Sequence, residues 1–237
     1  MRLKRELAAL AERYSLPPEA QNQLAALTEL LISDARAATS VRDPGQVVAD
    51  HIADSLVALE LPQVREADAI ADLGSGAGLP GLPLAIARPD AVVCLVESSG
   101  RKCAFIARAA STCGLPNTQV VNARAEAWVQ GIGRHDLVAA RALAPLPVVA
   151  EYAAPLLRVG GALVAWRGRR EHDEETAAAR AAEELGLEPA APLAVRPYPG
   201  ARHRHLHLMS KIRPTPSRFP RRPGVARKRP LGLRPTV

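Results

Sequence analysis

The sequence predicts an α/β fold in which helices cover both faces of a mostly parallel sheet. Short apolar runs alternate with helical stretches between about residues 68 and 168. A glycine-rich turn, GSGAGLPG (74–81), separates the first apolar run from the first helical stretch. A helical pattern precedes this region and a proline-rich basic segment follows it. We therefore expect three parts: an N-terminal helical cap (1–60), the α/β domain (61–212) and a basic tail (213–237).

The first predicted elements are an amphipathic helix and a series of strands. PPEAQNQLAALTELLISDA (17–35) begins with prolines that suit a first helical turn, and it places Leu24, Leu27 and Leu31 on one face. The expected strands are ADAIADL (67–73), AVVCLVE (91–97), TQVVN (118–122), HDLVAA (135–140) and GGALVAW (160–166). Strand, helix, strand in this order predicts parallel pairing.

Helices are expected between these strands, and two more strands after them. GRKCAFIARAAST (100–112) and APLPVVAEYAAPLLR (144–158) are typical of helices that cross between parallel strands, and EHDEETAAARAAEELG (171–186) predicts a third helix. PLAVRPY (192–198) and RHRHLHLMSK (202–211) are expected to be the final strands. The last alternates polar and apolar residues, which predicts a half-exposed antiparallel strand at an edge of the sheet.

Composition argues against several classes of function. Aromatic residues make up 3% of the chain, too few for an RNA-binding surface of stacked rings. The three cysteines form no CxxC pair, which argues against a disulfide framework and a zinc site. No stretch approaches the roughly 18 apolar residues of a membrane span. We expect a soluble, cytoplasmic, monomeric protein with no metal and no membrane contact.

Two polar clusters resemble familiar sites. HIADSL (51–56) contains a histidine, an aspartate and a serine, but neighbours on one helical turn diverge and cannot converge as a nucleophilic triad. His203, His205 and His207 would share one strand face, but no run of acidic or cysteine residues accompanies them. Neither cluster is expected to be catalytic or to bind a metal.

The net charge of +7 is concentrated in the tail. Residues 213–237 contain eight basic residues, six prolines and no acidic residue, while the rest of the chain has 23 basic residues against 24 acidic ones. Such a segment buries too little apolar surface to order itself, so we expect it to be disordered. It could bind a polyanion with salt-dependent affinity, or act only as a solvated terminus that aids solubility.

The glycine-rich turn predicts a small polar ligand. A helix entered directly from a strand aims unpaired N–H groups at the crevice, and glycines let the ligand approach the backbone. The G-x-G-x-x-G pattern from Gly76 is typical of dinucleotide binding, whereas D-x-G-x-G-x-G from Asp72 is common in S-adenosylmethionine-binding methyltransferases. The second register places Gly74 directly after the strand, where the tight turn is needed, and we favour it. An ordinary structural turn is the third interpretation.

Glu97, at the end of the next expected strand, adds a constraint. A carboxylate there can accept hydrogen bonds from both hydroxyls of an adenosine ribose, and it would repel a 2′-phosphate. Glu97 alone could equally be a solvated acid, but its position after the glycine turn favours ribose binding.

Further motifs carry a resemblance to a known family. They are VRDPGQVVADHIADSL (41–56), DLGSGAGLPGLPLAI (72–86), LVESSGRKCAFI (95–106), NARAEAW (122–128), HDLVAARALAPL (135–146) and LLRVGGALVAWRG (156–168). With them the chain, from about residue 5 to 212, resembles the bacterial 16S ribosomal RNA guanine-N7 methyltransferases, also called the glucose-inhibited division protein B or RsmG family. The resemblance implies a class I methyltransferase fold, Rossmann-like, with a seven-stranded sheet whose last strand is antiparallel. It also implies methyl transfer from S-adenosylmethionine to one guanine N7 in the 530 loop of 16S rRNA in the small ribosomal subunit.

The resemblance also implies roles for individual residues. The implied cofactor-binding residues are Asp72, Gly74, Ser75, Gly76, Ala77, Gly78, Leu79, Glu97, Ala125, Glu126 and Arg141. Within this set the glycine turn would wrap the methionine part, Glu97 would bind the ribose, and Ala125 and Glu126 would line the adenine. Arg141 would lie beside the methyl donor and is the expected catalytic residue.

The chemistry requires alignment more than proton transfer. Guanine N7 carries a lone pair and no proton, so no general base has to deprotonate it. The site must align N7 with the methyl group and the sulfur and suit the dispersing positive charge. We expect Arg141 or Arg167 to hold guanine O6 or a neighbouring phosphate. The resemblance also implies that Arg204 lies near the RNA surface.

Some positions depart from the family pattern, and two other functions stay open. Ala37 replaces a usual asparagine, Arg167 replaces a lysine, and Arg101-Lys102 reverses the usual order. A dinucleotide-dependent oxidoreductase is supported only by the register from Gly76. A non-catalytic ribosome-associated RNA-binding protein is suggested by Ala37 and the basic tail.

Overall fold

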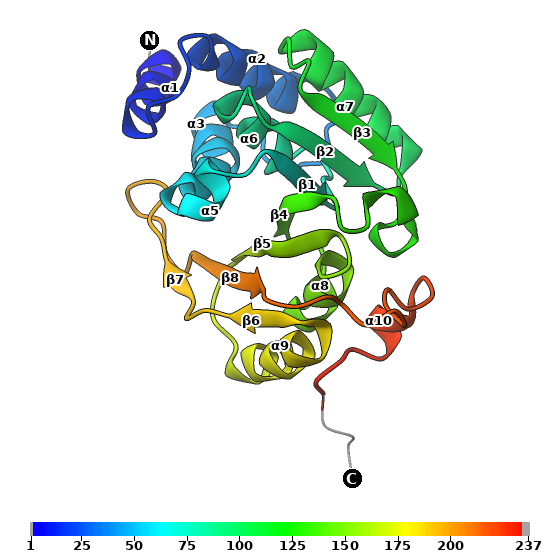
Figure 1. Ribbon diagram of the computed structural model, residues 1–237. Helices are drawn as coiled ribbons and strands as arrows, with labels where there is room; N and C mark the ends of the chain where they lie inside the picture. The colour runs from blue at the N-terminus through cyan, green and yellow to red at the C-terminus, as the bar shows by residue number, and fades with distance from the viewer. Residues whose placement is uncertain (1, 234–237) are drawn as a thin grey trace.

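The computed structural model describes residues 2–233, built around one central sheet (Figure 1). The strand order is β3-β2-β1-β4-β5-β8-β6, and the short β7 pairs with β8. Strands β1 to β5 pair in parallel, whereas β8 runs antiparallel to its neighbours. The strands are β1 (Ala69–Leu73), β2 (Val92–Glu97), β3 (Thr118–Asn122), β4 (His135–Arg141), β5 (Leu157–Arg167), β6 (Leu187–Pro189), β7 (Leu193–Ala194) and β8 (His205–Lys211).

The helices lie before, between and after these strands. They are α1 (Arg2–Arg13), α2 (Ala20–Ser33), α3 (Pro44–Gln46), α4 (Asp54–Leu56), α5 (Pro62–Arg65), α6 (Gly81–Ala87), α7 (Gly100–Thr112), α8 (Leu146–Ala153), α9 (His172–Leu185) and α10 (Val225–Lys228). A π-helix, η1 (Val47–Ala53), and three 3₁₀ turns, η2 (Val57–Glu60), η3 (Ala125–Ala127) and η4 (Val129–Gly131), complete them. Among residues 2–233, no helix is both long enough and apolar enough to span a bilayer.

Both faces of the sheet are buried, as the near-continuous apolar strands predict. Leu137 and Ala139 of β4 pack in the core that contains the N-terminal helices, α6 and α7. Their neighbours Val138 and Ala140 point to the opposite face, where α8 and α9 pack. Figure 1 shows α2 and α7 on one side of the molecule and α8 and α9 on the other. The predicted doubly covered, mostly parallel sheet is confirmed, and β7 is a two-residue addition to it.

Three expected elements differ from the prediction. Helix α8 is shorter than 144–158, because Pro155 disfavours helical backbone before it and Leu157 already begins β5. The segment 192–198 contributes only the two-residue β7. Strand β8 is antiparallel as expected, but it is not at the edge: β5 lies on one side and β6 on the other, so alternation alone was misleading.

The C-terminal segment (213–233) is packed on the domain, unlike the disordered tail that its composition predicts. Phe219 and Ala226 are buried, and Arg221 pairs with the buried Glu151 of α8. The acidic partners of the segment belong to the domain, so the composition of the segment alone does not predict that it packs there. The last four positions, 234–237, lie outside the described residues.

Candidate functional site

The glycine turn directly follows β1. Gly74, Gly76 and Gly78 all have positive φ angles, +69°, +58° and +81°, which favour glycine. A Cβ atom on Gly74 would lie 2.5 Å from Cδ1 of Leu143. The turn therefore has the geometry expected for the register that begins at Asp72.

Asp72 stabilises this turn through hydrogen bonds. Its side chain is fully buried, and Oδ2 accepts a hydrogen bond from the backbone N–H of Gly81 at 3.0 Å. The Ser75 hydroxyl donates to the Asp72 carbonyl oxygen at 2.9 Å. Burial raises the pKa of Asp72 to about 6. Asp72 thus connects the end of β1 to the start of α6 and supports the turn without lining a cavity.

Glu97 meets the turn from the adjacent strand. Parallel pairing of β1 with β2 brings the two strand ends together, with Leu73 opposite Val96. The Glu97 carboxylate is buried, and its Oε2 accepts from the Gly76 N–H at 3.1 Å while Oε1 accepts from the Ser99 N–H at 2.8 Å. Oε1 also accepts from the Ser98 hydroxyl at 3.4 Å, and Nζ of Lys102 lies 3.9 Å from Oε2, so Oε2 is the oxygen with room for a further hydrogen bond. Glu97 is thereby held at the point where a ligand over the turn would reach it.

A first cavity of about 260 Å³ opens beside this carboxylate. Four predicted residues line it, namely Gly74, Glu97, Ala125 and Glu126, whereas Ser75, Gly76, Ala77, Gly78 and Leu79 do not. The remaining lining residues are Val96, Ser98, Lys102, Ala123, Arg124, Ala142, Leu143, Tyr152 and Arg227. The sequence position of Lys102, one turn after the end of β2, is a signal that it lies near the cavity. Tyr152 and Arg227 give no such signal, because only the tertiary fold brings them to the cavity.

A second cavity, of about 540 Å³, lies at the carboxyl ends of β4 and β5. Its lining residues are Asp50, His51, Asp54, Arg141, Ala142, Trp166, Arg167, Gly168, Arg169, Glu171, Val195, Arg204 and His205. Ala142 lines both cavities and has a φ angle of +53°, which is unfavourable for a residue with a side chain. The two cavities therefore meet at a strained residue directly after β4.

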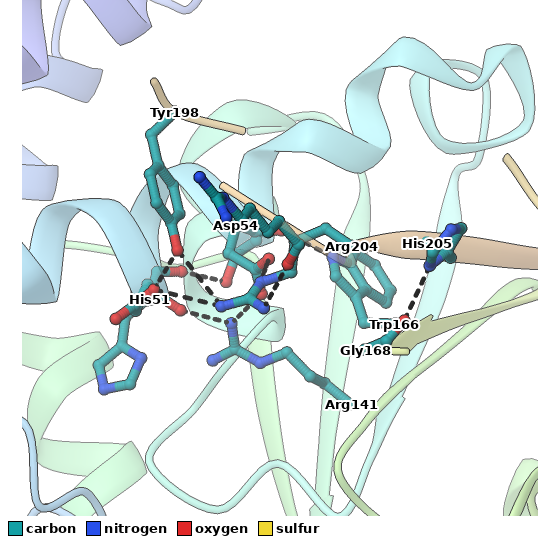
Figure 2. Close-up of polar contacts among 11 residues, drawn as sticks. His51, Asp54, Arg141, Trp166, Gly168, Tyr198, Arg204 and His205 are labelled. Carbon is teal, nitrogen blue, oxygen red and sulfur yellow. Dashed lines mark hydrogen bonds and ion pairs between the residues drawn. The ribbon is translucent and has the colours of Figure 1, made fainter. Parts of the chain in front are cut away.

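Asp54 is the centre of a charged network in the second cavity (Figure 2). Its Oδ2 accepts from Nη1 of Arg141 at 3.0 Å, and Nε of Arg204 lies 3.3 Å from Oδ1. The Trp166 indole N–H donates to the Asp54 carbonyl oxygen at 2.7 Å. The network joins η1 and α4, near the N-terminus, to β4, β5 and the segment before β8, and it fixes the Arg141 guanidinium where β4 ends.

Asp50 extends the network towards solvent. Its Oδ1 accepts from the Tyr198 hydroxyl and lies 3.4 Å from Nη2 of Arg204. Asp50 belongs to the π-helix η1, an uncommon conformation that is frequent at functional sites. Its side chain is 35% exposed, compared with 9% for Asp54. The cavity thus offers a carboxylate acceptor and guanidinium donors in one connected network.

The other polar clusters form no catalytic unit. The Ser55 hydroxyl donates to the His51 carbonyl oxygen at 2.5 Å, and Asp54 pairs with Arg141, so both side chains of HIADSL have other partners. Burial lowers the pKa of His51. Among residues 2–233, no group of three or more potential ligand side chains is arranged to hold a metal ion. Ala37 is buried in the core that contains α2.

The arrangement suits an adenosine-bearing ligand beside a planar polar group. The first cavity combines a backbone turn that tolerates close approach with a fixed carboxylate, as ribose binding requires. Ligands of open α/β sheets bind outside the carboxyl ends of the strands, which is where both cavities lie. The S-adenosylmethionine expected from the sequence thus fits the residues of the first cavity.

Comparisons with known proteins show the family and the fold. A family model described as rRNA small subunit methyltransferase G matches residues 20–198. The ribosomal RNA small subunit methyltransferase G of Rubrobacter xylanophilus is 42% identical over 221 residues, which are 89% of this chain and 85% of the relative. A solved S-adenosylmethionine-dependent methyltransferase from Aquifex aeolicus aligns with a TM-score of 0.53 at 15% identity, over 70% of this chain and 93% of that one. Aeropyrum pernix fibrillarin, solved with natively bound S-adenosyl-L-methionine, aligns with a TM-score of 0.52 at 19% identity, over 66% and 72%.

Proposed function

This chain belongs to the rRNA small subunit methyltransferase G family, and we propose that it methylates N7 of one guanine in the 530 loop of 16S rRNA, with S-adenosylmethionine as the methyl donor. The class I methyltransferase fold is shared with its structural neighbours. The observation that carries the proposal is the meeting of the two cavities at Ala142, one suited to the cofactor and the other to a base. The ribosomal RNA of the small subunit is the partner that this function requires.

The first cavity would hold the cofactor. Glu97 would accept hydrogen bonds from the ribose hydroxyls, Ala125 and Glu126 would line the adenine, and Gly74 would leave room for the chain that leads to sulfur. When bound, S-adenosylmethionine supplies a methyl group on a positively charged sulfur. Asp72 would act indirectly, since it keeps the turn and α6 in register.

The second cavity would hold the guanine. A carboxylate such as Asp50 can accept hydrogen bonds from the guanine N1–H and N2–H groups, while a guanidinium can donate to O6. These contacts leave N7 free. Arg141, fixed by Asp54 at the end of β4, would orient the guanine or an adjacent phosphate. It needs no role as a general base, because N7 carries no proton.

Methyl transfer to small subunits tests the proposal. Subunits from cells that lack the gene for this protein would be incubated with S-adenosylmethionine labelled in the methyl group, and the rRNA would be digested and mapped by mass spectrometry. We expect one labelled 7-methylguanosine in the 530 loop, and no label with Glu97→Ala at a limiting cofactor concentration. Label on another atom or another loop would contradict the site, and binding of NADH in place of S-adenosylhomocysteine would favour the oxidoreductase.

A further inference from the structure

The C-terminal segment reaches the first cavity, although its sequence predicts a free tail. Arg227 of α10 lines the same cavity as Glu97, Ala125 and Glu126. The segment lies beyond residues 20–198, which the family model matches. We propose that residues 213–233 form part of the cofactor-binding site and that Arg227 contacts the adenosine of the cofactor. The inference rests on the proposed function, which places the cofactor in this cavity.

A buried ion pair anchors the segment. Both oxygens of the Glu151 carboxylate, 1% exposed, accept from the Arg221 guanidinium, and Nε of Arg221 lies 2.7 Å from Oε1. Two-point contacts of this kind fix the orientation of the guanidinium as well as its position. Phe219 and Ala226 are buried on either side of the pair in sequence. The segment is therefore positioned by the α8 face of the domain.

Two further contacts position α10 at the rim of the cavity. The backbone N–H of Gly224 donates to Oε1 of Glu126 at 3.1 Å, so the segment contacts a residue that lines the cavity. Nη2 of Arg227 donates to the Leu143 carbonyl oxygen at 2.8 Å. Leu143 also lines the cavity and closely approaches Gly74. The Arg227 guanidinium is thus fixed on the turn after β4, and the start of α10 is fixed on the segment after β3.

The chemistry of a guanidinium suits this place. The wall formed by Glu97, Ala125 and Glu126 is the one at which ribose and adenine would lie. A guanidinium donates to ring nitrogens and packs flat against aromatic faces, and it does both better than an ammonium group. Arg227 keeps free N–H groups beyond the one that Leu143 accepts. Because Arg227 lines the same cavity as these three residues, adenosine is the group that we expect it to contact.

Calorimetric binding to the full-length protein tests the inference. S-adenosylhomocysteine and methylthioadenosine, which lacks the amino acid, would be titrated into wild type, Arg227→Ala, Arg227→Lys and Lys228→Ala. Lys228→Ala is the matched control, because it removes the same charge from the same short helix without touching the cavity. We expect Arg227→Ala to weaken both ligands about five- to tenfold, Arg227→Lys to weaken them less, and Lys228→Ala to leave them unchanged.

Limited proteolysis gives a second readout. Trypsin cleaves after arginine and lysine, and α10 offers Arg227 and Lys228. If the packed segment strengthens ligand binding, bound ligand must stabilise the packed segment to the same extent, because coupling is reciprocal. S-adenosylhomocysteine should therefore slow cleavage of the segment. Cleavage that is unaffected by saturating ligand would overturn the inference.

Glu97→Ala separates failure of the inference from failure of the proposed function. If wild type binds S-adenosylhomocysteine and Glu97→Ala weakens it, the cofactor occupies this cavity. Equal affinity of Arg227→Ala and Lys228→Ala would then refute the role of Arg227 alone. Loss confined to S-adenosylhomocysteine, with methylthioadenosine unaffected, would place Arg227 at the amino-acid part and would also refute the inference. No binding by wild type would overturn the proposed function itself.

Discussion

The two cavities lie at the same edge of the sheet but are built in different ways. The first depends on backbone, with a glycine turn after β1 and one carboxylate held by N–H groups at the end of β2. The second depends on charged side chains that come from η1, β4 and the segment before β8. Substitutions in the first cavity should therefore change cofactor affinity alone. Substitutions in the second should change the positioning of the guanine and the stability that comes from linking distant parts of the chain.

The largest expected effect is that of Asp54→Asn. The amide leaves the guanidinium groups of Arg141 and Arg204 without their shared carboxylate, in a cavity where Asp54 is 9% exposed. We expect a loss of about 3 kcal/mol in the free energy of unfolding, because breaking a buried pair leaves uncompensated charge. Methyl transfer should fall at least about 100-fold, since a small misplacement of the reacting groups is costly. Denaturant unfolding and initial rates would measure the two effects.

Affinity for S-adenosylhomocysteine shows whether the cavities are separate. It should change less than about twofold in Asp54→Asn, because the variant leaves the glycine turn and Glu97 intact. Asp43→Asn is the control, since Asp43 is an exposed helix cap to which asparagine is equally suited. An affinity loss that matched the loss in rate would mean that the two cavities form one coupled site.

Asp72→Asn tests the support below the first cavity. Burial raises the pKa of Asp72 to about 6, above the ordinary value near 3.8 that it would have in the unfolded chain. The folded protein therefore binds more protons between these values, and its stability falls as the pH rises from about 4 to about 6. The asparagine variant lacks this loss, which amounts to about 3 kcal/mol. Unfolding free energies across this pH range should show the difference between variant and wild type growing with pH, and parallel curves would contradict the assignment.

The sequence predicts the first cavity because its parts are local. The positive φ angles of Gly74, Gly76 and Gly78 require glycine, so the motif specifies the turn directly. Glu97 ends an apolar run, and parallel pairing brings that end beside the turn. The strands β1 to β5 and their parallel pairing follow from the same alternation of strands and helices. Arg141, which directly follows the apolar run 135–140 and lines the second cavity, is expected only from the family resemblance.

The second cavity and the C-terminal segment are not local, and the sequence predicts them poorly. Asp50 and Tyr198 are far apart in the chain, and the tertiary fold brings them into contact where the segment before β8 passes η1. Strand β8 itself inserts between β5 and β6. A strand with alternating residues gives no sign of that insertion. Likewise, Arg221 looks solvated until Glu151 is placed opposite it. Whether the basic tail also binds RNA stays a prediction.

A moderate effect is expected from Glu97→Gln. The amide keeps one acceptor oxygen, but its NH2 group cannot accept, and the side chain loses the charge that strengthens contacts with ribose hydroxyls. Affinity for S-adenosylhomocysteine should fall about tenfold while affinity for rRNA stays unchanged. Glu188→Gln, an exposed acid in β6, is the matched control. Equal cofactor affinity in both variants would show that Glu97 does not bind the cofactor. Loss of RNA affinity in Glu97→Gln would mean that the two cavities form one coupled site.

The smallest expected effect concerns RNA at the rim of the second cavity. Arg202 is exposed beside Arg204 and offers a charge to a phosphate, whereas Arg222 is exposed in the C-terminal segment near the first cavity. Arg202→Ala should weaken binding of a small-subunit rRNA fragment about two- to threefold. The slope of log affinity against log salt concentration should become shallower by about 0.7 to 0.9, which corresponds to one phosphate contact. Arg222→Ala should change neither. A larger effect of Arg222→Ala on affinity and slope would identify the C-terminal segment as the RNA-binding arm, and RNA would then approach from the side of the first cavity.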